Sequence, residues 1–359
     1  MARRVTVGVL IAANTGLMLS VAGNLTSLSD VLAPLMGHFI GIGLAASLAL
    51  LARRRMMATL AVGFAATLAV HAILGLAQCC RAPTEKGGTA TLTTASQETG
   101  RGLTVLTLNT WHGNDDAGRI EQYLLSVPAD IIVLSEFGPT KQALLTRLRD
   151  VYPFQVECAG EWPCSLVMLS RVPLESAGAS RIAADKPAFL WARLAEAQHG
   201  ALTIIGTHLR RPSLNPWEHE KQMAELAQFI RRIDGPLVLA GDLNTSPWSQ
   251  AFRSLRMATG LQPAGLLTPS WPAWPVAIPQ VALDHILVSQ ELSVSSAGTG
   301  PAVGSDHLPV WAHIRRRPLA VYRNRPRTGS RLAAAAPHLG SQLLADFRSE
   351  HGGARNLRR

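Results

Sequence analysis

The sequence predicts an α/β domain of about 210 residues behind three long apolar segments. Along residues 102–315, short apolar runs closed by turn residues alternate with stretches of helical period. This is the pattern of a sheet covered by helices. Ahead of it, residues 1–80 contain apolar segments near the ~20 residues that a helix needs to cross a bilayer. We therefore expect a membrane domain followed by a separate α/β domain.

The apolar segments cover residues 5–22, 31–51 and 56–77, and none of them contains Lys, Arg, Asp or Glu. Arg3 and Arg4 precede the first segment, and three arginines at residues 53–55 separate the second from the third. By the positive-inside rule both clusters lie in the cytoplasm. We expect a multi-pass protein of the inner cell membrane with three transmembrane helices and its later domain on the periplasmic side. A signal peptide at the first segment, or a helical soluble domain, is the alternative.

The formal net charge of +10 comes from the two ends of the chain. Residues 315–359 have a net charge of +9 and residues 1–80 a net charge of +4, which leaves −3 for residues 81–314. This middle part has no basic stripe that would follow a duplex backbone. Nucleic acid stays open as a partner, but the charge does not favour it.

Composition also predicts what flanks the α/β domain. Residues 81–101 are rich in Thr, Gly, Ser and Ala, which predicts a flexible linker. Residues 316–359 predict a basic, disordered tail, with contact to anionic lipid headgroups as the alternative.

Each element of the domain follows from its local pattern. Apolar runs that stop at polar or turn residues predict buried strands at residues 103–108, 130–135, 165–170, 190–194, 202–207, 237–244, 281–288 and 308–314. Helical period predicts helices at residues 120–125, 141–149, 218–232 and 252–257. A loop rich in Pro and Trp is expected at residues 263–279.

Polar side chains follow or flank most of these strands. Asp242 and Asn244 are two positions apart on an extended chain, so both side chains point to one face. The other such residues are Asn109, Glu136, His208, Asp284, His285, Asp306 and His307. Each of them alone could be an Asx turn, a solvated strand end or a hydrogen-bonded imidazole. Because a sheet gathers its strand ends along one edge, we expect them to form a site there.

The types of residue at this edge predict a metal. Several carboxylates close together repel one another unless a divalent cation neutralises them. Carboxylate and amide oxygens without a thiolate suit Mg²⁺ or Mn²⁺ better than zinc. We therefore expect Mg²⁺ (or Mn²⁺) as the cofactor.

Taken in order, six motifs resemble those of the endonuclease/exonuclease/phosphatase superfamily: Leu-Asn-Thr, Ser-Glu-Phe, Gly-Thr-His-Leu, Gly-Asp-Leu-Asn, Leu-Asp-His-Ile-Leu and Gly-Ser-Asp-His-Leu-Pro-Val. This superfamily includes deoxyribonuclease I, abasic-site endonucleases, neutral sphingomyelinases and inositol-polyphosphate phosphatases. The resemblance covers residues 103–314. It implies a two-sheet, four-layer α/β sandwich of the deoxyribonuclease I type. With the leading apolar segments, the chain resembles bacterial membrane-anchored members.

The resemblance also implies a role for each site residue. The metal ligands would be Asn109, Glu136 and Asp306, and the catalytic residues would be His208, Asp242, Asn244, Asp284 and His307. Asp242 would orient or deprotonate the attacking water, and Asn244 would hold that water or the phosphate. His307 would face the phosphate with its tautomer fixed by Asp284, while His208 would bind a non-bridging oxygen or help the leaving group. Positioning and charge neutralisation are the main requirements of phosphoryl transfer.

We expect a membrane-anchored, Mg²⁺-dependent phosphodiesterase or phosphatase that hydrolyses a phosphate ester outside the cytoplasm. A monomer in contact with the lipid bilayer is expected. The alternatives are a metal-dependent DNA endonuclease or exonuclease, and a non-catalytic binding protein on the same fold.

Cys158 and Cys164 frame a short loop, which predicts a disulfide on the oxidising side of the membrane. Two unpaired buried thiols are the alternative. Trp248, Trp271 and Trp274 are expected near the mouth of the site. They would pack under the loop, stack on a base or sugar, or dip into the lipid interface.

Overall fold

The computed structural model describes residues 2–22, 30–51, 102–158, 165–181, 188–195, 202–265, 268–275 and 280–317. The predicted apolar segment at residues 56–77, the predicted linker and nearly all of the predicted tail lie outside these residues. Two six-stranded mixed sheets form the α/β domain. The predicted α/β class is confirmed.

The first sheet has the strand order β11-β12-β1-β2-β4-β3. Its strands are β1 (Leu103–Asn109), β2 (Ile131–Ser135), β3 (Phe154–Glu157), β4 (Val167–Ser170), β11 (Leu292–Thr299) and β12 (Val310–Arg316). The second sheet has the order β5-β6-β7-β8-β10-β9. Its strands are β5 (Leu174–Arg181), β6 (Ala188–Leu194), β7 (Thr203–His208), β8 (Leu237–Asp242), β9 (Gln262–Pro263) and β10 (Asp284–Val288).

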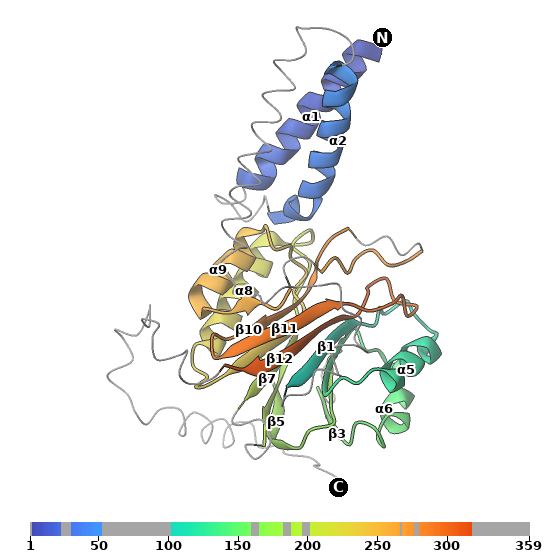
Figure 1. Cartoon of the computed structure of the whole chain (residues 1–359), viewed down its shortest axis with the longest axis vertical. Coiled ribbons are helices and arrows are strands. Elements are labelled where there is room, and N and C mark those ends of the chain that lie inside the picture. The colour runs from blue at the N-terminus through green and yellow to red at the C-terminus, as the bar shows by residue number, and fades with distance from the viewer. Residues whose placement is uncertain are drawn as a thin grey trace, which may run out of the picture.

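Alternation of apolar residues along the central strands produces the layers. The inner faces of the two sheets meet in one core, to which β1 contributes Val105 and β8 contributes Val238 and Ala240. The opposite face of the first sheet packs under α5 (Ala117–Ser126) and α6 (Ala143–Arg147), which follows the 3₁₀ turn η4 (Pro139–Lys141). The opposite face of the second sheet packs under α8 (Pro216–Ile230) and α9 (Gln250–Thr259). The result is the predicted four-layer sandwich (Figure 1).

The two sheets share one pairing pattern. Each has a single parallel pair among the described strands, β1 with β2 in the first and β7 with β8 in the second, and all other pairs are antiparallel. Parallel neighbours end at the same edge, so each sheet presents two carboxyl-terminal strand ends side by side. The antiparallel strand β10 brings its first residue to that edge, because Asp284 pairs with Asp242.

The edge strands β3, β5, β9 and β11 were not predicted, whereas the central strands were. Edge strands are half exposed and need no continuous apolar run. The sequences of β5 and β11, LESAGASR and LSVSSAGT, consist mostly of small and polar residues. Cys158, directly after β3, is disulfide-bonded as predicted, and its expected partner Cys164 lies outside the described residues.

The N-terminal region forms a helical hairpin of α1 (Ala2–Ala22) and α2 (Met36–Leu51), with the short turn η2 (Ala33–Leu35) before α2. The ring of Phe39 packs where Gly16 has no side chain. Within the described residues, no helix combines the length and the apolar character needed to cross a membrane. The expected spans at residues 5–22 and 31–51 are therefore not found. In the second of them, Pro34 lies in the 3₁₀ turn η2, and α2 begins after this turn and has 16 residues.

Gly241, in β8, is required by the parallel pairing of β7 and β8. Its φ is +149°, and a Cβ atom there would lie 1.9 Å from the carbonyl oxygen of Thr207. We expect Gly241→Ala to lower the free energy of unfolding by about 3 kcal/mol, through backbone strain and the clash. Chemical denaturation of purified protein measures this. Gly138→Ala is the control because no atom lies within 4 Å of its added Cβ. Equal stability of the two variants would contradict this account of β8.

Candidate active site

The carboxyl ends of the two parallel strand pairs form the site. Asn109 ends β1 and Glu136 directly follows β2, while His208 ends β7 and Asp242 ends β8. His208 and Asp242 are register partners in the second sheet. The strand-end residues predicted from separate motifs therefore lie together.

The backbone is unusual at this edge. Trp111, Glu136 and Asn244 all have positive φ values, of 57°, 51° and 49°, and they are the non-glycine residues with this conformation in the described part of the chain. Positive φ is uncommon outside glycine and is concentrated at functional sites. Each of these residues lies within two positions of a strand end.

Asn109 joins the two sheets at the centre of the site. Its amide Nδ2 donates to Oε1 of Glu136 at 3.0 Å and to Oδ2 of Asp242 at 2.9 Å. All three side chains are buried. Asn109 therefore holds one carboxylate of each sheet toward the other.

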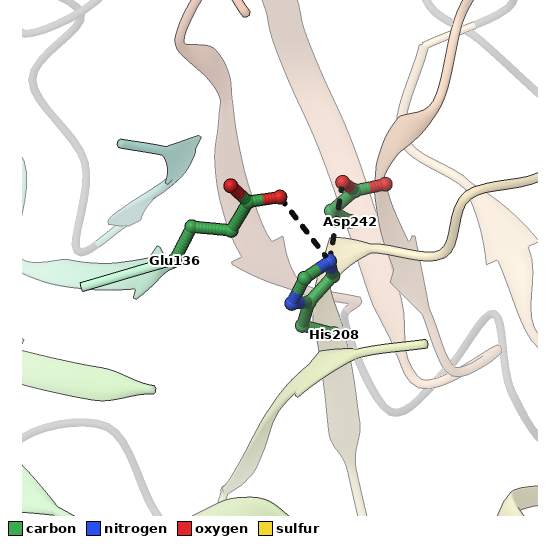
Figure 2. Close-up of side chains that lie close together, drawn as sticks. All are labelled: Glu136, His208 and Asp242. Atoms are coloured by element: carbon green, nitrogen blue, oxygen red, sulfur yellow. Dashed lines mark ion pairs between the residues drawn. The ribbon is translucent and has the colours of Figure 1, made fainter. Parts of the chain in front are cut away.

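His208 lies between the same two carboxylates. Its Nε2 is 3.8 Å from Oε1 of Glu136 and 3.7 Å from Oδ2 of Asp242, as Figure 2 shows. The three side chains converge from three strand ends, with the imidazole partly exposed. This leaves one face of the cluster open to a ligand.

His307 and Asp284 form a buried pair beside Asp242. Nδ1 of His307 is 2.7 Å from Oδ2 of Asp284, and the Ser270 hydroxyl donates to the same oxygen at 2.6 Å. Nε2 of His307 lies 4.0 Å from Oδ2 of Asp242. The carboxylate thus fixes the imidazole so that its other nitrogen faces the centre of the site.

Asn244 and Asp306 lie at the edges of this cluster. The backbone N–H of Asn244 donates to Oδ1 of Asp242 at 2.8 Å, and its Nδ2 donates to the Leu209 carbonyl at 2.9 Å. Asn244 therefore holds Asp242, and its role toward a phosphate stays a prediction. Asp306 keeps Oδ1 buried without a hydrogen-bond partner and receives a hydrogen bond from the Trp271 side chain.

Three residues of the site were missed from the sequence. His112 contacts Oε2 of Glu136 through both its backbone N–H, at 3.0 Å, and its Nδ1, at 2.8 Å. Arg211 places Nη2 3.7 Å from Oε1 of Glu136. Ser270, described above with Asp284, is the third. None of them directly ends a predicted strand, although His112 follows Asn109 closely and Arg211 follows His208 closely.

Two of the three expected tryptophans, Trp271 and Trp274, lie at the edge of the site. The expected position of Trp248 stays a prediction. Trp274 is 53% exposed and its ring centroid lies 5.2 Å from that of Trp111. Trp271 is 36% exposed, and its backbone pairs with Val281. The pair Trp111–Trp274 leaves an indole in solvent beside Asp306, whose carbonyl oxygen accepts from the Ala273 N–H at 2.6 Å. Trp274 therefore packs on Trp111 and is also exposed to solvent.

The pKa values of the site residues are shifted in different directions: that of Glu136 is lowered, and those of Asp242 and His307 are raised. Burial would raise the pKa of Glu136, but hydrogen bonds from Asn109 and His112 together with His208 lower that pKa to about 2. Burial, then the nearby Asp284 carboxylate, raise the pKa of Asp242 above its usual value. Burial opposes the charge on His307, yet Asp284 outweighs it and raises the His307 pKa to about 10. The site therefore combines an anionic Glu136, a more basic Asp242 and a cationic His307.

These residues fit a divalent cation. Ligand atoms of Glu136, His208 and Asp242 all lie within 4.8 Å of one another, and so do those of Asp242, Asp284 and His307. Oδ1 of Asp306 and Oδ1 of Asp284 are buried without a partner, which leaves acceptors unsatisfied. Oxygen-rich donors of this kind suit Mg²⁺ or Mn²⁺. Asp306, expected among the metal ligands, is in neither group of three.

Comparison with solved structures finds similar proteins of low sequence identity, and those with TM-scores of at least 0.50 share the fold. A humanized TDP2 from D. rerio is 16% identical, with a TM-score of 0.52, and covers 60% of this chain and 100% of its own. A functionally unknown conserved protein from Enterococcus faecalis is 14% identical, with a TM-score of 0.50, and covers 60% and 100%. Sphingomyelinase C from Streptomyces griseocarneus is 19% identical, with a TM-score of 0.45, and covers 59% and 99%.

No curated protein matches the sequence. The model of the Endonuclease/Exonuclease/phosphatase family matches residues 106–307, which is more than half of the chain. These limits run from β1 to His307 and enclose the site described above. The chain belongs to the endonuclease/exonuclease/phosphatase family, whose members hydrolyse phosphate esters.

Proposed function

We propose that this protein is a divalent-metal-dependent phosphodiesterase or phosphatase attached to the cytoplasmic membrane, with its catalytic domain outside the cytoplasm. The observation that supports the chemistry best is the cluster of Glu136, His208 and Asp242 beside the His307–Asp284 pair. It combines three carboxylates and two imidazoles at one edge of the two sheets, and one carboxylate oxygen, Oδ1 of Asp284, is buried without a hydrogen-bond partner. Phosphoryl transfer needs this combination of charge neutralisation and fixed acid–base groups.

Glu136, Asn109 and Asp306 would hold Mg²⁺ or Mn²⁺. When bound, the cation would neutralise the carboxylates and polarise a phosphoryl oxygen. The low pKa of Glu136 keeps this ligand ionised at neutral pH. Asn109 holds Glu136 toward Asp242 and so fixes the direction in which the carboxylate faces.

The remaining residues act on the water and the phosphate. Asp242, with its raised pKa, can accept a hydrogen bond or a proton from the attacking water. The cationic His307 faces the same place and would stabilise charge on the phosphate, with Asp284 holding its tautomer. His208, partly exposed between the two sheets, would donate to a non-bridging oxygen or to the leaving group. Asn244 keeps Asp242 oriented through its backbone N–H.

A DNA nuclease is the second candidate within this chemistry. The Trp111–Trp274 pair supports it, because exposed indoles can stack on bases. The net charge of −3 over residues 81–314 argues against it. We therefore favour a small or membrane-bound phosphate ester over duplex DNA. A non-catalytic binding protein is the third candidate, and an intact set of acid, base and ligand residues argues against that one.

Attachment to the membrane is supported by the N-terminal hairpin. Its outer surface exposes large apolar side chains that nothing described covers: Val5, Val9, Ile11, Ile42, Leu44 and Leu48. Arginine clusters at residues 3–4 and 53–55 favour the cytoplasm. Asp30, between α1 and α2, contacts the catalytic domain, as expected if both lie on the far side. We propose a monomer, and we propose that the basic residues 318–359 contact anionic lipid headgroups.

We expect full-length protein to hydrolyse bis-p-nitrophenyl phosphate with Mg²⁺ or Mn²⁺ and to lose this activity in EDTA. Asp242→Asn and His307→Ala should each lower kcat by about 10²-fold or more, because each removes an acid–base or charge-stabilising group. Asp130→Asn, at the opposite end of β2, is the control and should keep the wild-type rate. Equal rates with and without EDTA would refute the metal requirement. Parallel assays on plasmid DNA and on lipid phosphodiesters separate the candidate substrates.

The proposed orientation predicts the behaviour of reporter fusions. Alkaline phosphatase joined after residue 317 should be active, and green fluorescent protein joined there should be dark, because the arginines at residues 53–55 stay inside. Fusions directly after Arg55 provide the control and should show the opposite pattern. Fluorescence after residue 317 would place the catalytic domain in the cytoplasm.

A further inference from the structure

Asp30 connects the N-terminal hairpin to the catalytic domain. Its side chain is 3% exposed, and its two oxygens accept hydrogen bonds from the backbone N–H groups of Gln250, at 2.6 Å, and Ala251, at 2.8 Å. Gln250 and Ala251 are the first two residues of α9. Asp30 is also the only acidic residue among the first 80 in the sequence. One carboxylate from 220 residues away thus caps this helix.

The cap supplied by Asp30 complements the one inside α9. The hydroxyl of Ser249 accepts from the N–H of Phe252, which leaves the N–H groups of the first two residues without a local acceptor. Asp30 satisfies both of them and places a negative charge at the positive end of the helix. Arg253, in the first turn, adds a favourable charge near the carboxylate. The geometry is that of a specific docking contact.

A second contact connects the hairpin to the other side of the site. Nε2 of His38, in the first turn of α2, is hydrogen-bonded to the Gln280 side chain. The backbone N–H of Gln280 donates to the carbonyl of Trp271 at 2.9 Å. The Trp271 side chain in turn donates to Asp306. Asp30 and His38 therefore contact the two segments that flank the strand ends, and Figure 1 shows the hairpin standing at the α9 end of the domain.

The segment between Asp242 and α9 connects the contact of Asp30 with α9 to the active site. Asn244 binds Asp242 through its backbone N–H, and the hydroxyl of Thr245 lies 2.5 Å from that of Ser249. The carbonyl of Thr245 accepts from Nε2 of His285 at 2.7 Å. These side chains are buried. The hydrogen bond between Ser249 and Thr245, the peptide bond from Thr245 to Asn244 and the hydrogen bond from Asn244 to Asp242 together connect the start of α9 to the catalytic carboxylate.

We infer that the N-terminal hairpin is a positioning element of the active site, in which Asp30 fixes α9 and, through residues 244–249, the carboxylate of Asp242. This inference rests on the proposed function for its effect on turnover. Asp30 touches no reacting atom, so it acts as a positioning residue. Displacement of the hairpin would loosen both segments that flank the site. The region proposed to contact the membrane would thereby set the activity of the catalytic domain.

The test compares Asp30→Ala and Asp30→Asn with Asp130→Ala in the full-length protein. Asp130 is a matched control, because its Oδ2 also accepts from a backbone N–H, that of Thr104, at 2.7 Å, but at the opposite end of the sheet. Hydrogen–deuterium exchange of residues 243–252 and 268–275 is measured together with kcat and KM. The exchange readout does not require a known substrate.

We expect Asp30→Ala to speed exchange in residues 243–252 about fivefold, the scale of a lost helix cap, and to lower kcat about tenfold with KM changed less, because Asp242 is misplaced. Asp30→Asn keeps one acceptor and should fall between Asp30→Ala and wild type. Asp130→Ala should leave both readouts unchanged. Unchanged exchange at residues 243–247 in Asp30→Ala, or a kcat loss equal to that of Asp130→Ala, would overturn the inference. If the wild type hydrolyses nothing, the proposed function fails, and exchange alone decides the docking role.

Discussion

The parallel pairing of β1 with β2 and of β7 with β8 is the constraint on which the rest of the structure depends. Because each pair ends at the same edge, Asn109 and Glu136 from one sheet meet His208 and Asp242 from the other. The antiparallel strands beyond them add the first residue of β10 and the residues before β12. A shift of one register position in either pair would turn these side chains to the opposite face. The site is therefore specified by the sheets more than by its loops.

The second constraint is the cost of burying like charges. Glu136, Asp242 and Asp284 are all buried, and Asp242 lies in one cluster with Glu136 and in a second cluster with Asp284. Three features of the protein reduce the repulsion between these carboxylates: hydrogen bonds to Glu136, a raised pKa at Asp242 and a protonated His307 beside Asp284. These compensations keep the groups in different protonation states, which is the arrangement that acid–base catalysis requires.

The sequence predicted the central strands, the covering helices and every strand-end residue of the site, because each strand end combines an apolar run with an abrupt polar stop. It did not predict the edge strands β5 and β11, since small polar residues are enough for a strand exposed on one side. His112 and Arg211 were missed because their contacts with Glu136 depend on how two loops fold over the sheet edge. The contact of Asp30 with α9 was not predicted, because it joins residues 220 positions apart in the sequence.

The proposed mechanism requires that the carboxylates at this edge bind a divalent cation and that Glu136 is one of its ligands. Titration calorimetry of Mg²⁺ or Mn²⁺ into metal-free protein tests it most directly. The matched control is Glu121→Gln, because Glu121 is a partly exposed glutamate paired with Arg147. We predict saturable binding to the wild type and to the control, and an affinity at least about tenfold lower in Glu136→Gln. Equal affinity in all three proteins, or no binding to the wild type, would contradict the account.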